Sequence, residues 1–205
     1  MTAIPQTTTS GRPRWLLPVG LAASILLVLG LLLVLPYNGL VTRQATVDQK
    51  FADLDVQLQR RNDLIPNLVS AVKGALNQEQ TVFGELARAR QGYAGARSVE
   101  DKAAASSQID AGIGRLLAIV ESYPQLRSND NIRDLQTQLE GTENRIAQAR
   151  RDFNGAVTSY NVAIRRFPRS LVAGAMGFDR RPLFEAAPGA TTSPTVDLAP
   201  TTTAP

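Results

Sequence analysis

The feature that most restricts how this chain can fold is a run of 21 residues without a charge, from Trp15 to Leu35. At a rise of about 1.5 Å per residue, a helix of this length measures roughly 31 Å, about the thickness of the hydrocarbon core of a bilayer. Trp15 and Tyr37 bracket the run, as aromatic side chains often do at membrane surfaces. The run therefore predicts a membrane-spanning helix over residues 15–36.

A cleaved signal peptide is the alternative interpretation, but it would have a shorter apolar core and a small-residue cleavage site. Here "PYNGLV" follows the core and contains no A-x-A pattern, which favours a retained, single-pass anchor. Arg12 and Arg14 lie close before the run, whereas Arg43 and Lys50 follow it at greater distance. By the positive-inside rule this small asymmetry favours a cytoplasmic N-terminus with the rest of the chain outside.

Neither Cys nor His occurs in the chain, which excludes disulfides, thiol nucleophiles, Cys/His zinc sites and a histidine base. A di-iron bundle site needs Glu-x-x-His motifs, and the nearest pattern, Glu140 to Glu143, has no His. We therefore predict no cofactor, no metal and no enzymatic activity. The net charge is +4 with acids interspersed among the arginines, which favours contact with a lipid bilayer over nucleic acid.

After the anchor, apolar residues recur at helical spacing over 40–58, 65–86, 109–120 and 132–167, and no segment sustains period-two alternation. Ser98 with Asp101 forms an approximate capping box before the third segment, and Ser128 or Asn129 caps the fourth and longest. The pattern predicts an all-α fold. We expect a helical domain over residues 37–186 between disordered tails at 1–14 and at 187–205, the latter rich in Thr and Pro.

The stretch "DVQLQRRNDLIPNLVSAVKG" decides the predicted topology. If Asp63 is an N-cap, Pro66 falls in a first helical turn and Arg60 and Arg61 fall in the last turn of the preceding helix. This predicts an antiparallel up-and-down four-helix bundle whose long C-terminal helix returns to the membrane. The alternative is one long helix kinked at Pro66, which would leave three helices.

The fourth segment also carries polar residues near its apolar stripe, and such groups need partners if they are buried. They predict either a polar network that fixes helix register or a groove for a ligand or partner. The candidate positions on this segment are Glu143, Arg150 and Asn154. Those on the preceding segments are Arg60, Arg61, Asp63, Pro66 and Glu121.

The segment from Ile164 to Ala186 mixes arginines with large apolar side chains. Beside a bilayer such a mixture would lie in the interface, with its cations on anionic headgroups. The alternative is that its apolar residues cap the open end of the bundle. The candidate membrane contacts are Arg165, Arg166, Arg169, Arg180 and Arg181.

Four stretches of this chain resemble the LemA family of bacterial membrane proteins: "YNGLV", the Pro66 stretch above, "AIVESYPQLRSNDNIRDLQTQLEGTENRIAQARRDFNGAVTSYNVAIRRFP" and "AGAMGFDRRPLFEA". The resemblance covers Tyr37 to about Ala186. It implies an N-terminal anchor in a bacterial cell membrane followed by an antiparallel four-helix bundle. It supplies no activity and no catalytic residue.

Taken together, these features predict a non-enzymatic interaction or scaffold protein that recruits another membrane or envelope protein. A second copy of the chain is a further candidate partner. The alternative is a sensor or regulator of envelope stress that works with a protease or signalling protein.

Overall fold

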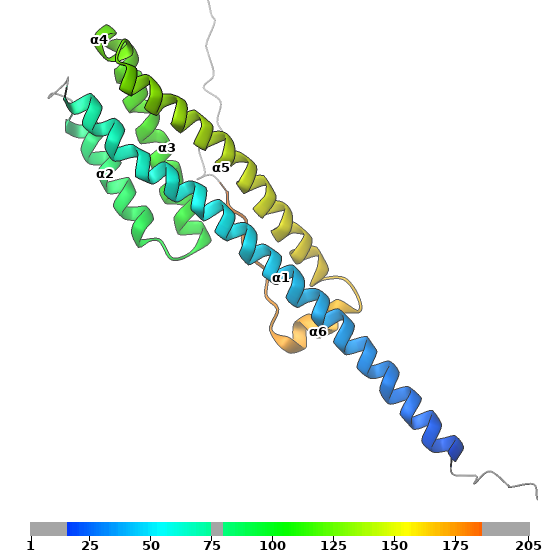
Figure 1. Cartoon of the computed structure of the whole chain (residues 1–205). Coiled ribbons are helices and arrows are strands. Elements are labelled where there is room, and N and C mark those ends of the chain that lie inside the picture. The colour runs from blue at the N-terminus through cyan, green and yellow to red at the C-terminus, as the bar shows by residue number, and fades with distance from the viewer. Residues whose placement is uncertain (1–15, 75–79, 186–205) are drawn as a thin grey trace, which may run out of the picture.

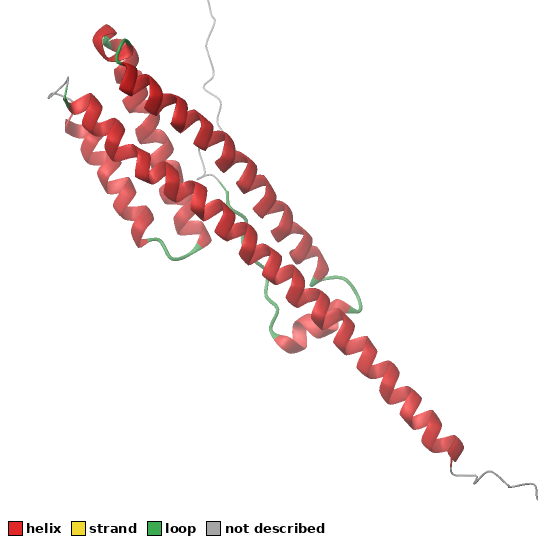
Figure 2. Cartoon of the chain, in the orientation of Figure 1, coloured by secondary structure: helices red, strands yellow, loops and turns green. Residues whose placement is uncertain are grey.

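A computed structural model of the 205-residue chain describes residues 16–74 and 80–185. Every regular element in these ranges is an α-helix, which confirms the predicted all-α class (Figure 2). The helices are α1 (Leu16–Lys73), α2 (Gln80–Gly95), α3 (Val99–Ser122), α4 (Pro124–Arg127), α5 (Asp130–Ala163) and α6 (Arg169–Met176). The two tails predicted to be disordered lie outside the described residues.

Helix α1 is uninterrupted through both Pro36 and Pro66, so the predicted turn at Pro66 is wrong. Asp63 is not a helix cap: its carboxylate is exposed and accepts a hydrogen bond from Gln59 Nε2, 2.9 Å away, one turn earlier in the same helix. A proline in a helix interior costs about 3 kcal/mol. Burial of Ile65 and Leu68 on either side of Pro66 favours the continuous helix.

The chain first reverses after Gly74, because α1 ends at Lys73 and α2 begins at Gln80. From there α2, α3 and α5 run alternately back and forth beside α1 (Figure 1). Helix α5 packs along α1, and α3 packs along α2. As a result α5 ends beside the N-terminal part of α1, where α6 also contacts α1.

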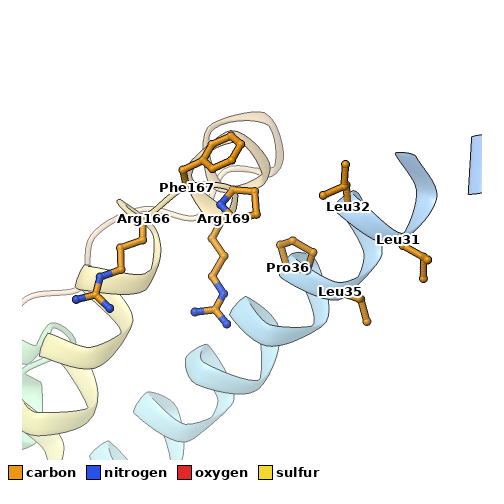
Figure 3. A pocket seen from close by; sticks show the side chains of 8 residues that line it. Leu31, Leu32, Leu35, Pro36, Arg166, Phe167 and Arg169 are labelled. Atoms are coloured by element: carbon orange, nitrogen blue, oxygen red, sulfur yellow. The ribbon is translucent and has the colours of Figure 1, made fainter. Parts of the chain in front are cut away.

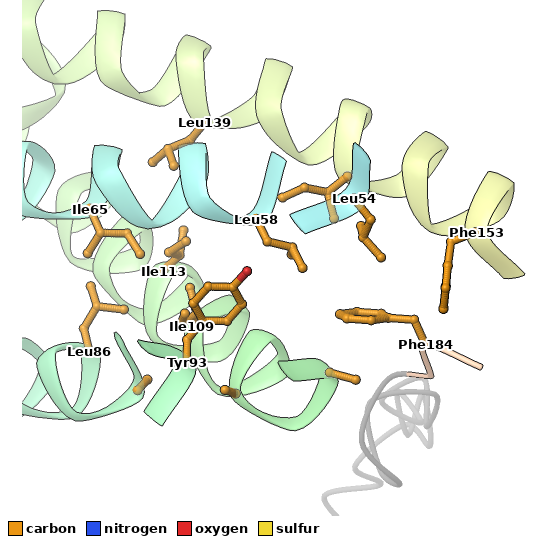
Figure 4. Close-up of a cluster of buried hydrophobic side chains, with 14 of the residues drawn as sticks. Leu54, Leu58, Ile65, Leu86, Tyr93, Ile109, Ile113, Leu139, Phe153 and Phe184 are labelled. Carbon is orange, nitrogen blue, oxygen red and sulfur yellow. The ribbon is translucent and has the colours of Figure 1, made fainter. Parts of the chain in front are cut away.

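The hydrophobic core lies between the α1–α5 pair and the α2–α3 pair (Figure 4). Leu54 and Leu58 of α1 are buried here with Leu86 of α2, Ile109 of α3 and Phe153 of α5. The same side chains form the apolar stripes of the sequence. Ser98 Oγ accepts a bond from the Asp101 N–H and Asn129 Oδ1 accepts from Asn131 and Ile132, so the predicted capping of the third and fourth segments is confirmed.

Towards its N-terminus α1 leaves this core and exposes a series of large apolar side chains. Each of the following is about half exposed or more: Val19, Leu21, Leu26, Leu27, Leu31, Leu32, Leu33, Val34 and Leu35. Within residues 16–74 and 80–185, no helix combines the length and the apolar character needed to cross a membrane. The predicted span over residues 15–36, which begins at Trp15 outside these ranges, is therefore not confirmed.

Candidate functional site

The most deeply buried charged side chain in the described part of the chain is Arg61, in the middle of α1, at 1% exposure. Its Nη1 pairs with Asp110 of α3 and donates to Glu143 Oε1 of α5 at 3.0 Å. Its Nη2 donates to Ser106 Oγ at 2.8 Å. Arg61 therefore joins α1 to both α3 and α5, and we call these four residues the Arg61 cluster.

The charged groups of the Arg61 cluster differ in their access to water. The side chains of Asp110 and Glu143 are 46% and 45% exposed, so their carboxylates reach water while the guanidinium does not. Burial raises the pKa of the Asp110 carboxyl, an effect that the Arg61 charge opposes and the like charge of Glu143 reinforces. Arg61 Nε has no hydrogen-bond partner among the described residues. The cluster surrounds the buried Arg61 guanidinium with two carboxylates and one hydroxyl.

A second polar contact between the helix pairs lies two turns away on α1, at Asp55. Its Oδ1 accepts from Tyr93 Oη at 2.6 Å and from Lys102 Nζ at 2.5 Å. The same ammonium lies 5.3 Å from the centre of the Phe51 ring and 5.6 Å from that of Tyr93, within cation–π range. Burial raises the pKa of Tyr93 far above its ordinary value, and the Asp55 hydrogen bond adds to this. Tyr93 therefore stays a neutral donor.

Directly after Arg61 on α1, Asn62 accepts a third contact: Arg90 of α2 donates its Nε–H to Asn62 Oδ1 at 3.1 Å. The polar contacts of residues 55–62 thus link α1 to α2, α3 and α5 in one band across the bundle. In the described residues no group of acidic side chains is placed to hold a metal ion. Each charged side chain of this band pairs with a group on a neighbouring helix, as the members of a buried polar network do.

The structure brings together two of the predicted site residues, Arg61 and Glu143. Arg60 and Glu121 are exposed elsewhere on the surface. Arg150 is half-buried and acts on Asp110 through its charge. Pro66, also half-buried, lies beyond Arg61 within the same helix.

The sequence interpretation missed Ser106, Asp110, Asp55, Tyr93 and Lys102. One signal was available for the first two, which lie one helical turn apart on α3. They border the buried Ile109 and Ile113, at the edge of the apolar stripe.

Asn154, another predicted site residue, lies outside the Arg61 cluster and binds the backbone of Phe184. It lies on α5 and faces residues 178–185, an extended stretch after α6 that we call the return segment. Its amide donates to Phe184 O at 3.1 Å and accepts from Phe184 N at 2.9 Å. Asn161, two turns away on α5, makes the same pair of bonds with Arg181, at 2.8 and 2.9 Å. The two amides clamp the return segment along α5 and place Phe184 in the core (Figure 4).

The five arginines predicted to contact a membrane are divided by the structure. Arg165, Arg166 and Arg180 are exposed and Arg169 is half-buried, whereas Arg181 is engaged with Asp48 at 3.1 Å. The apolar residues among them are divided too. Val172, Ala173 and Phe184 are buried against the bundle, while Phe167, Leu171 and Met176 are exposed. The segment both caps the end of the bundle and presents an apolar, cationic surface.

Beside this surface a groove of about 610 Å³ separates α1 from the connection between α5 and α6 (Figure 3). Its α1 side is formed by Leu31, Leu32, Leu35 and Pro36. Residues 166–169 form the other side and include two arginines. The groove lies where the exposed apolar part of α1 meets the packed body of the protein.

The fold and these contacts define an all-helical protein in which one buried arginine joins three helices and one long helix carries an exposed apolar end. Residues 50–198 match the sequence model of the LemA family, and the chain belongs to this family. It is 30% identical over 201 residues to magnetosome protein MamQ of Magnetospirillum gryphiswaldense, covering 84% of this chain and 74% of the relative. Magnetosome protein MamQ 1 of Paramagnetospirillum magneticum is 28% identical over 186 residues, covering 78% of this chain and 68% of the relative.

Proposed function

We propose that this LemA-family chain is a membrane-anchored, single-pass protein without enzymatic activity, which positions a helical bundle at a bilayer surface to bind a partner. The observation that carries the proposal is the continuity of α1. One helix passes from a series of exposed leucines before Pro36 into the core that begins at Leu40. Exposed apolar surface of this extent is rare in a protein surrounded by water, and membrane contact would cover it.

The uninterrupted helix also suits a scaffold role. From Tyr37 to Lys73 a straight helix extends about 55 Å, because each residue adds about 1.5 Å. With the apolar part of α1 in a bilayer, the end of the bundle at α4 would stand at about this height above it. The exposed arginines and Phe167 at the opposite end would then lie at the headgroups. We expect the N-terminus in the cytoplasm of a bacterial cell and the bundle outside.

Membrane attachment is tested by adding charge to α1 in the full-length chain. Leu27→Arg with Leu33→Arg places two cations in the exposed apolar part. We expect the parent protein to sediment with membranes after a high-salt wash and the double variant to be released, because arginine is unfavourable in hydrocarbon. Val56→Arg is the matched control, since Val56 is equally exposed but lies on the body. Sedimentation of the double variant like the parent would refute attachment through α1.

Partner binding is tested by photocrosslinking in intact cells. The structure selects the positions, because Arg61 is buried and a probe there would meet only the protein itself. Probes at Arg60 and Glu121 would sample the exposed surface of the body. We expect one defined adduct with a membrane or envelope protein, or with a second copy of the chain. Absence of any defined adduct at either position would contradict the scaffold role.

A reporter fused after Ala186 tests the orientation of the chain in the membrane. Reporter activity on the cytoplasmic side would overturn the expected topology.

A further inference from the structure

The groove between α1 and the α5–α6 connection changes character along its length. Leu31, Leu32 and Leu35 form an apolar wall towards the N-terminus of α1, and Phe167, 79% exposed, stands at the opposite side. The guanidinium of Arg169 points along α1 away from Leu31 and Leu32 (Figure 3). The groove is therefore apolar towards the exposed end of α1 and cationic towards the body.

The two guanidinium groups of the groove have no polar partner in the described part of the chain. Neither the Arg166 nor the Arg169 side chain has a hydrogen bond or ion pair within residues 16–74 and 80–185. No acidic residue lines the groove. Arg169 lies close against α1 at Gly39: two of its side-chain nitrogens are 3.7 Å from where a Cβ of residue 39 would stand, an ordinary contact distance. Arg181, by contrast, is already paired with Asp48 and cannot serve a ligand as freely.

We propose that this groove is a binding site for one anionic phospholipid. The phosphate would accept hydrogen bonds from Arg166 and Arg169, and an acyl chain would lie against Leu31, Leu32 and Phe167. Arginine suits phosphate because its planar donors match two oxygens at once. The order of apolar wall and cations matches the order of acyl chain and headgroup in a bilayer. A volume of about 610 Å³ is ample for part of one lipid. The site rests on the proposed membrane attachment, but it adds selectivity for a headgroup.

The test is native mass spectrometry of the full-length chain released from detergent micelles. Phosphatidylglycerol, phosphatidylcholine with the same acyl chains, and glycerol phosphate are titrated in parallel. We expect phosphatidylglycerol to bind about tenfold more tightly than phosphatidylcholine, because the choline cation of phosphatidylcholine cancels the negative charge that faces the two arginines. We expect a similar advantage of about tenfold or more over glycerol phosphate, which has no acyl chain to lie against the apolar wall. Arg166→Gln with Arg169→Gln should reduce that binding by about tenfold or more.

The matched control is Arg165→Gln with Arg180→Gln, which removes the same charge from exposed positions that do not line the groove. We expect it to change binding by less than about twofold, because only general attraction is lost. Equal losses in both double variants, or equal affinity for the two phospholipids, would overturn the site. Glycerol phosphate binding as tightly as phosphatidylglycerol would identify a site for small anions instead.

Membrane sedimentation separates this proposal from the one on which it rests. The Arg166→Gln and Arg169→Gln protein should still sediment with membranes, because α1 carries the attachment. If the parent chain does not sediment, the proposed function fails whatever the spectra show. If it sediments but shows no headgroup selectivity, only the lipid site fails.

Discussion

Arg61 and Asp110 form an ion pair whose two ends lie in different surroundings. The guanidinium is 1% exposed and the Asp110 side chain is 46% exposed. Removing the arginine therefore leaves carboxylates that water can solvate, whereas removing the carboxylates leaves a cation that water cannot reach. The two halves of the cluster should contribute unequally to stability.

We expect Asp110→Asn with Glu143→Gln to destabilise the protein by about 3 kcal/mol, the usual penalty for leaving a buried charge without its partner. Arg61→Met keeps a long apolar side chain in the same place, and it should cost no more than about 1 kcal/mol. Chemical denaturation of the detergent-solubilised chain measures both values. A larger loss in Arg61→Met than in the double variant would refute this asymmetry.

The same pair makes stability depend on pH. The pKa of Asp110 is raised above its ordinary value of 3.8, chiefly by burial, so the folded chain keeps this proton at a pH where the unfolded chain has released it. Stability should consequently fall as pH rises from about 3.8 through the folded pKa. Asp110→Asn should remove this part of the pH dependence of the unfolding free energy, whatever it does to the free energy itself.

Thermal unfolding at several pH values between 3 and 7 would measure that slope. Asp134→Asn is the control, because Asp134 is exposed on α5 outside the Arg61 cluster. A carboxyl NMR titration of Asp110 would give its pKa directly. A value below 3.8 would contradict the expected sign.

The two hydrogen bonds of Asn154 should make a contribution to stability that can be measured at the return segment itself. Asn154→Ala removes both hydrogen bonds to Phe184 and leaves a peptide group beside the core without its partners, a loss of about 1–3 kcal/mol. The effect should be confined to the return segment, because the variant removes no side chain that packs between α1 and α5.

Hydrogen exchange of the Phe184 amide reports this directly. We expect protection there to fall by at least about fivefold, in line with a loss of about 1 kcal/mol or more, while amides in the middle of α1 are unchanged. Asn154→Asp is a useful companion, because it keeps an acceptor and removes the donor. Unchanged protection of the Phe184 amide in Asn154→Ala would show that the core, rather than the amide, holds the segment.

Much of the helical fold follows from local pattern. The apolar stripes and the caps at Ser98 and Asn129 are properties of neighbouring residues, so they can be read from sequence. The Arg61 cluster is harder, because its members come from α1, α3 and α5. Glu143 stood out beside the apolar stripe of the fourth segment, and Arg61 stood out in the charged stretch before Pro66. Asp110 resembles any acidic residue on a solvated helix face, and only packing shows that it meets Arg61.

Pro66 shows where local rules fail. Its restricted backbone and the charges before it favour a helix boundary, yet α1 continues and the chain reverses after Gly74. Both sites are plausible boundaries in sequence. Long-range packing decides between them: in the continuous helix Ile65 and Leu68 are buried in the same core as Leu54 and Leu58.

A continuous helix through Pro66 leads to a specific expectation. Proline has no N–H, so the carbonyl of Asn62 lacks its normal partner in the helix. Pro66→Ala restores this bond and removes a half-buried ring, and it also makes the unfolded chain more flexible. The helix penalty of about 3 kcal/mol exceeds these opposing effects, so we expect a net gain in stability of roughly 1 kcal/mol.

Asn67→Ala, at the next and exposed position, controls for helix propensity alone. Denaturation of the three proteins gives the comparison. A loss of stability in Pro66→Ala would mean that the proline ring supports the Arg61 region more than its missing hydrogen bond weakens it.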